Sequence, residues 1–145
     1  MTVAELALET RLLLALAGAV FLWALALGVL KYRQILASPT GHAHPYVDIA
    51  HRSALMYSFA LLLLAVFAEL STWPTAVDAT AGLIAAFFFV AAIGSYHWHG
   101  VRRDTDNQLR HPDRLVRTFM VALIVGEIGG SAVLVAGFLQ AWLRS

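Results

Sequence analysis

The chain has 145 residues, of which 60% are hydrophobic and only 13% are charged. Soluble domains are about 45–50% apolar and about 25% charged, and a chain of this length has too much surface for its volume to bury so many apolar side chains. The composition therefore predicts an integral membrane protein. The absence of cysteine excludes disulfides, iron–sulfur clusters and thiolate-ligated haem, and the net charge of +1 indicates no nucleic-acid partner.

Four apolar segments follow one another, each close to the roughly 20 residues that span a bilayer. They are Leu12–Leu30, Ser53–Ala68, Ala79–Tyr96 and Thr118–Leu143, and Glu127 is the one acidic or basic residue inside them. Backbone amides in hydrocarbon must be hydrogen-bonded within their own segment, which favours helices. We predict one all-α domain over residues 1–145, an integral membrane four-helix bundle with helices at about 12–30, 46–70, 78–98 and 113–143.

The first and third loops carry most of the positive charge. Pro45 with Asp48, and Pro112 with Asp113, resemble helix starts after these loops. Eight of the ten basic residues lie in or beside the two loops, namely Lys31, Arg33, Arg52, Arg102, Arg103, Arg110, Arg114 and Arg117. The positive-inside rule places both loops in the cytoplasm and both termini outside. Some of these arginines could instead bind an anionic ligand.

All six histidines lie at this same end of the predicted bundle: His42, His44, His51, His97, His99 and His111. Imidazole is a common ligand of iron, copper and zinc, so this end is the candidate site. His51 is the leading candidate because it lies where the second helix enters the membrane. Asp48 shares its helix face and could orient the imidazole; in the alternative, the two residues only pair at the membrane interface.

Three further features bear on function. Tyr96 ends the third segment at the depth of His51, and Tyr57 lies about 120° around the second helix from His51; either could be only a belt or packing residue. Glu127 lies in mid-membrane, where a carboxyl is costly and usually faces protein or water. Small residues at Ala122, Gly126, Gly130 and Gly137 predict close helix packing, within one protomer or between protomers.

Three short motifs together resemble a known family. Ile49-Ala50-His51 followed by Ala54-Leu55 opens the second segment, Gly94-Ser95-Tyr96 closes the third, and Asn107-Gln108 shortly precedes the fourth. In order and spacing these motifs resemble those of the membrane-bound styrene oxide isomerases, small four-helix haem proteins. The resemblance covers roughly residues 12–140.

The resemblance implies that His51 is the axial ligand of a ferric haem b. It implies active-site roles for Tyr96, Tyr57 and Asn107, and a homotrimer with haem between its subunits. The substrate would be a small hydrophobic epoxide, which ferric iron opens as a Lewis acid so that a 1,2-shift yields a carbonyl compound. The family's asparagine six residues after the histidine is Tyr57 here, so substrate orientation must differ. Arg52 or the third-loop arginines could pair with the haem propionates.

We expect a multi-pass protein of a bacterial inner membrane, and two other functions stay open. A haem b protein for electron transfer or sensing would need a second axial histidine, for which His44, His97 and His99 are candidates. A non-haem metal site would instead gather His42, His44, His97 and His99 with Asp104 or Asp106.

Overall fold

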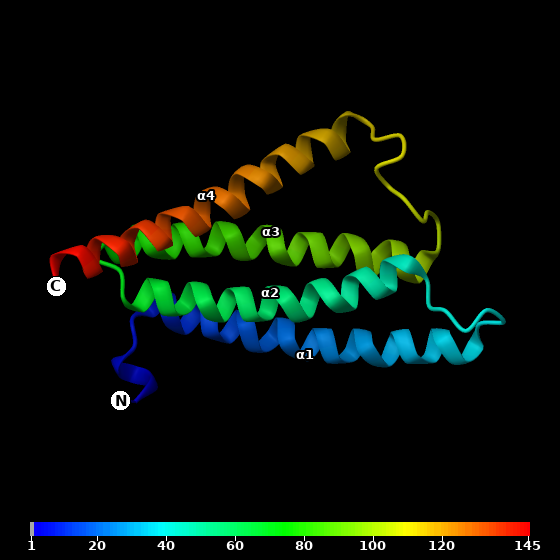
Figure 1. Cartoon of the computed structure of the whole chain (residues 1–145), viewed down its shortest axis with the longest axis horizontal. Coiled ribbons are helices and arrows are strands. Elements are labelled where there is room, and N and C mark those ends of the chain that lie inside the picture. Colours follow the sequence, from blue (N-terminus) through cyan, green and yellow to red (C-terminus); the bar gives the residue numbers. More distant parts are fainter. Residues whose placement is uncertain (1) are drawn as a thin grey trace.

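The structure, a computed structural model, describes residues 2–145, which form a bundle of four long helices (Figure 1). A short 3₁₀ helix, Val3–Glu5, precedes α1 (Leu8–Ala37), α2 (Pro45–Glu69), α3 (Thr75–Arg102) and α4 (Arg114–Arg144). All four α-helices are long and apolar enough to cross a membrane. The predicted all-α membrane bundle is therefore confirmed, and the protein is a multi-pass integral membrane protein.

Large apolar side chains cover the outside of the bundle, while small ones fill the helix contacts. Met56 and Leu22 are 73% and 68% exposed, as expected of side chains that face lipid. Ala24, Ala50 and Ala85, by contrast, are completely buried. Small residues at these contacts let helix backbones approach closely, which is how membrane helices gain packing energy.

The helix α1 continues seven residues beyond its predicted end. The uncharged run stops at Lys31, but the helix goes on to Ala37 because its polar side chains find partners in the bundle. Lys31 Nζ lies 2.5 Å from an Asp48 oxygen, and the buried Gln34 side chain donates to the Gly100 carbonyl at 3.4 Å. The length of an uncharged run therefore underestimates this helix.

Two helix starts are as predicted. Pro45 occupies the first turn of α2, and Asp113 caps α4 by accepting a hydrogen bond from the Val116 amide at 2.8 Å. The end of α3 differs, because the helix continues to Arg102 and stops at Arg103, whose left-handed backbone has φ 54°. Because α3 extends to Arg102, the third loop consists only of the residues between Arg102 and Arg114.

The small-residue stripe of α4 packs within the protomer. A side chain at Gly130 would collide with the Ala81 carbonyl of α3, and one at Gly126 would collide with the Phe88 ring. Gly137 packs in the same way against Trp73 in the α2–α3 loop. These three glycines therefore hold α4 against the rest of its own chain, whereas Ala122 is exposed, and packing between protomers stays a prediction. Toward its N-terminus α4 leans away from α2 and α3 (Figure 1).

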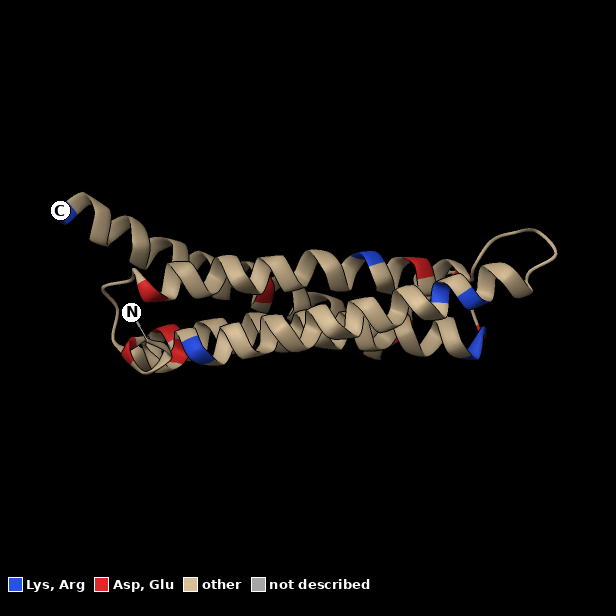
Figure 2. Ribbon diagram, turned by 90° about the horizontal axis from the view of Figure 1, so that it is seen from below, with Lys and Arg blue, Asp and Glu red and all other residues tan. Residues whose placement is uncertain are grey.

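Both long loops lie at one end of the bundle. Figure 2 shows most of the lysines and arginines of the ribbon near that end, with acidic residues among them, and a further group of Asp and Glu near the N-terminus at the other end. The segments that carry the six histidines therefore lie at the basic end of the bundle. The assignment of that end to the cytoplasm follows from the positive-inside rule and stays a prediction.

Candidate functional site

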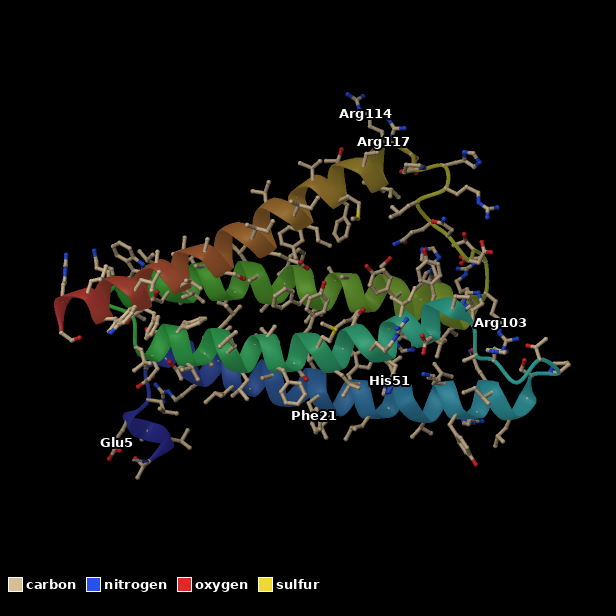
Figure 3. All side chains as sticks on the ribbon, viewed as in Figure 1. Glu5, Phe21, His51, Arg103, Arg114 and Arg117 are labelled. Carbon is tan, nitrogen blue, oxygen red and sulfur yellow. The ribbon has the colours of Figure 1, made fainter. Side chains whose placement is uncertain are left out.

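His51 lies on α2 with its ring against α1 (Figure 3). Its Nδ1 atom is 2.9 Å from the Ala24 carbonyl oxygen. Gly28, one turn further along α1, makes room for the ring: a Cβ atom there would lie 3.0 Å from His51 Cε1. The sequence therefore provides both a hydrogen-bond acceptor and a space that hold this imidazole on the α1–α2 face.

The Ala24 contact determines which nitrogen of His51 is free. A carbonyl oxygen only accepts hydrogen bonds, so Nδ1 must carry the proton. In the neutral ring Nε2 then has an unshared lone pair, and Nδ1–H bound to a carbonyl is the usual arrangement behind a histidine ligand. The neutral His51 ring therefore has its free lone pair on Nε2.

Asp48 does not take the role expected of it. Its carboxylate oxygens lie 2.5 Å from Lys31 Nζ and 2.9 Å from an Arg52 guanidinium nitrogen, and the His51 Nδ1 contact is made by Ala24 instead. The expectation that Asp48 orients the imidazole is therefore wrong. The reason is that the continuation of α1 brings Lys31 to Asp48, a partner that the spacing along α2 could not reveal.

Two other histidines are held in the opposite tautomer. The Trp23 indole N–H donates to His97 Nδ1 at 3.2 Å, and the Tyr46 amide donates to His44 Nδ1 at 3.2 Å. Both donors lack a lone pair, so Nδ1 accepts and the proton of the neutral ring lies on Nε2. Neither His44 nor His97 offers a free Nε2 lone pair in this arrangement.

The remaining histidines do not form a metal cluster. The His42 ring turns back to the Thr40 carbonyl at 2.7 Å on an exposed loop, and His111 lies exposed in the third loop. Among residues 2–145 no group of three or more His, Asp or Glu side chains is placed to hold a metal ion. The structure therefore does not bring together the residues of the proposed non-haem site.

Tyr57 of α2 and Tyr96 of α3 pack where α2 contacts α3, whereas the His51 ring lies against α1. Tyr57 stacks on Phe89 of α3 with ring centroids 4.3 Å apart, and Tyr96 stacks on Tyr46 of α2 at 5.9 Å. Tyr96 lines a cavity of about 300 Å³ between α3 and α4, whose wall does not include His51. Within one chain, the structure does not bring His51 and Tyr96 into a common cavity.

Glu127 points from α4 into the same region. It is partly buried, its Oε1 atom has no hydrogen-bond partner among the described residues, and its carboxyl interacts with the Tyr57 hydroxyl of α2. The carboxyl thus faces protein, as predicted for an ionisable side chain at this depth. Glu127 thus adds a carboxyl group beside Tyr57 of α2.

Asn107 and Gln108 of the third loop make different contacts. Asn107 is exposed, and its side-chain oxygen accepts from the Leu109 amide at 3.0 Å, which closes a local turn. Gln108 attaches the loop to the bundle. Its backbone N–H donates to the Tyr46 hydroxyl at 2.8 Å, and its side-chain oxygen accepts from the Ser95 hydroxyl at 3.1 Å. The resemblance implied an active-site role for Asn107, but Gln108 is the member of the pair that lines the α3–α4 cavity.

Charged groups surround this end of the bundle. His99 Nδ1 lies 2.7 Å from Asp104 Oδ1, and this hydrogen bond lowers the pKa of Asp104 below its ordinary value. Arg114 and Arg117, at the start of α4, point away from the helices (Figure 3). Arg103 instead lines a hollow of about 820 Å³ under the first loop, together with Lys31.

Comparison of the chain with protein-family models, with curated proteins and with solved structures finds no match. The resemblance to styrene oxide isomerases therefore rests on the short motifs alone. Everything that it implies about cofactor and reaction remains a proposal.

Two features of the site have no recognisable signal in the sequence. Gly28 lies in a long apolar run in which Gly18 is equally prominent, although Gly18 has open space beside it. The Ala24 carbonyl is a backbone group that any residue would provide. Both become visible only when α1 and α2 are packed together.

Proposed function

We propose that this protein binds haem b through His51 and is a membrane isomerase that converts a small hydrophobic epoxide into a carbonyl compound. The observation that supports this proposal is the His51 ring itself. Its Nδ1 is occupied by the Ala24 carbonyl at 2.9 Å, so the neutral imidazole presents its Nε2 lone pair to a metal.

The residues around His51 fit haem b. His51 would be the axial ligand, and Arg52 and Lys31 would pair with the propionates, whose carboxylates suit such cations. Lys31 of α1 and Arg52 of α2 both contact the carboxylate of Asp48, which lies about one turn before His51 on α2. Ferric haem held by one histidine supplies a Lewis acid with an open coordination position.

The histidine tautomers favour an isomerase over an electron carrier. A bis-histidine haem would need a second free Nε2, and the donors on His44 and His97 place the proton of each ring on that atom. His99 has a free Nε2 by the same reasoning, but it lines the α3–α4 cavity, which His51 does not. Within one chain, none of the three candidates His44, His97 and His99 therefore supplies a second axial ligand to a haem at His51.

The reaction also needs a hydrogen-bond donor for the substrate oxygen. As the C–O bond of an epoxide breaks, negative charge develops on that oxygen, and a phenol such as Tyr96 would stabilise it. A 1,2-shift then gives the carbonyl compound without gain or loss of atoms. Tyr57 would orient the substrate, and the turn held by Asn107 would position Gln108.

A trimer reconciles these roles with the structure. His51 lies on the α1–α2 face and Tyr96 on the α3–α4 side, so two copies must meet if both residues act on one substrate. A cyclic trimer joins one face of each subunit to a different face of the next. An interfacial haem between His51 of one subunit and the α3–α4 side of its neighbour meets this requirement.

The experiment is turnover of styrene oxide by protein reconstituted with haem b in detergent, with the carbonyl product identified by its mass. We expect Tyr96→Phe to lower turnover by about 10²–10³, the usual effect of losing one oxyanion donor, while the haem spectrum is retained. Tyr57→Phe should change the KM more than the turnover. Tyr32→Phe is the control, since that ring is 61% exposed. Haem-loaded wild-type protein that leaves styrene oxide and other aryl epoxides unchanged would contradict the isomerase.

A further inference from the structure

The cavity between α3 and α4 exists because α4 leans away from the bundle toward its N-terminus (Figure 1). At its middle, α4 is held against α3 by Gly130, which meets the Ala81 backbone. Toward the third loop the two helices separate and leave about 300 Å³ between them. This volume is at the lower limit of small-molecule sites, which are about 300–1,000 Å³.

The walls of the cavity have two different characters. The α4 wall is apolar and consists of Leu115, Phe119, Met120 and Leu123, with Val116 beside them. The opposite wall carries four polar side chains from α3 and the third loop: Ser95, Tyr96, His99 and Gln108. An apolar pocket with a few convergent polar groups is the usual form of a small-molecule site.

Two of the four polar side chains, Tyr96 and His99, are not bonded to another member of this wall and together offer a ligand oxygen one donor and one acceptor. Ser95 and Gln108 are bonded to each other at 3.1 Å. The Tyr96 hydroxyl has no hydrogen-bond partner among residues 2–145, and it is a donor. His99 is bonded to Asp104 through Nδ1 at 2.7 Å, which leaves Nε2 of the neutral ring as an acceptor.

We propose that this cavity binds a small apolar molecule with one hydroxyl group. The hydroxyl would donate to His99 Nε2 and accept from Tyr96, since it is the simplest group that satisfies a donor and an acceptor at once. His99 is one helical turn from Tyr96 on the same face of α3, which places both side chains at the same wall. Asp104 is a positioning residue, because it holds the His99 ring in the accepting tautomer.

This inference concerns one chain and does not rest on the proposed haem. The test is a pair of binding titrations with 2-naphthol and naphthalene, on protein in lipid nanodiscs, with empty nanodiscs subtracted. We expect one 2-naphthol per chain, bound about 30-fold more tightly than naphthalene, because two net hydrogen bonds of about 1 kcal/mol each are available. Met120→Trp should abolish binding of both probes by filling the cavity. Ile124→Trp is the control, since that side chain is 50% exposed on the same helix.

Variants of the polar wall make the test specific. His99→Ala should reduce 2-naphthol affinity about fivefold, since the Tyr96 hydrogen bond remains, and should leave naphthalene binding unchanged. His99→Gln, which keeps an acceptor, should restore part of the loss. Asp104→Ala should lower 2-naphthol affinity severalfold without changing naphthalene. Equal affinity for the two probes in the wild type would overturn the proposal, as would unchanged binding in Met120→Trp.

Discussion

At the scale of single residues, the chemistry of His51 is set by α1 rather than by its own helix. The Ala24 carbonyl fixes the tautomer, and Gly28 leaves the space in which the ring lies. A histidine at the mouth of a membrane helix is easy to find in the sequence. What makes it a potential ligand is a backbone oxygen 27 residues away.

We expect Gly28→Leu to remove haem binding while the chain still folds. A Cβ at Gly28 would lie 3.0 Å from His51 Cε1, so a longer side chain must displace the ring from Ala24. Overpacking of this kind costs about 1–3 kcal/mol, and the haem-to-protein ratio after purification should fall about tenfold or more. Gly18→Leu is the matched control, because nothing lies near that glycine. Equal haem content in the two variants would show that the ring does not need this space.

At the scale of elements, α4 is attached to the bundle by its glycines. Gly126 and Gly130 face α3, whereas Gly129 has no atoms near its Cβ position. The anchored half of α4 and the diverging half together create the α3–α4 cavity. The position of Tyr96 relative to α4 therefore depends on contacts several turns away.

Gly130→Leu should destabilise the protein, and Gly129→Leu should not. The added side chain at Gly130 meets the Ala81 carbonyl, a backbone group that cannot rotate away. The expected loss is about 1–3 kcal/mol or more in the free energy of unfolding, measured by SDS titration in mixed micelles. If instead Gly129→Leu causes the loss and dissociates an oligomer, the glycines serve contacts between chains.

The elements themselves were largely predictable from the sequence. Hydropathy and helix-start residues such as Pro45 and Asp113 place all four helices, because the bilayer demands long apolar helical segments. Helix ends beyond the membrane were less predictable, since α1 is extended by the partners of Lys31 and Gln34. The candidate site was predictable only as a set of residue types. Which of them meet depends on helix rotation, and the sequence contains no signal that places His51 and Tyr96 on different sides.

At the scale of the whole molecule, the central question is how separate faces form one site. In one chain the His51 face and the Tyr96 cavity are distinct. A cyclic trimer would bring each His51 to the Tyr96 side of a neighbour. Such a site would exist only at a junction between two subunits.

Co-expression of His51→Ala chains with Tyr96→Phe chains should restore part of the activity that each lacks alone. In a cyclic trimer, a junction with both wild-type residues forms when a Tyr96→Phe chain supplies His51 and its neighbour supplies Tyr96. Every mixed trimer has one such junction in three, so trimers that contain both kinds of chain should regain about a third of the wild-type activity. The check is turnover of styrene oxide by doubly tagged, co-purified trimers. No recovery would mean that both residues act from the same chain.

The most direct test of the account is the absorption spectrum of wild-type protein and of His51→Ala, each purified in mild detergent and supplied with haem b. The account predicts a Soret band in the wild type, its loss in His51→Ala, and a wild-type spectrum in the control His111→Ala, whose histidine is exposed in the third loop. Circular dichroism should show equal helix content in all three proteins. A His51→Ala protein that keeps the wild-type haem content and Soret band would contradict the assignment of His51 as the ligand.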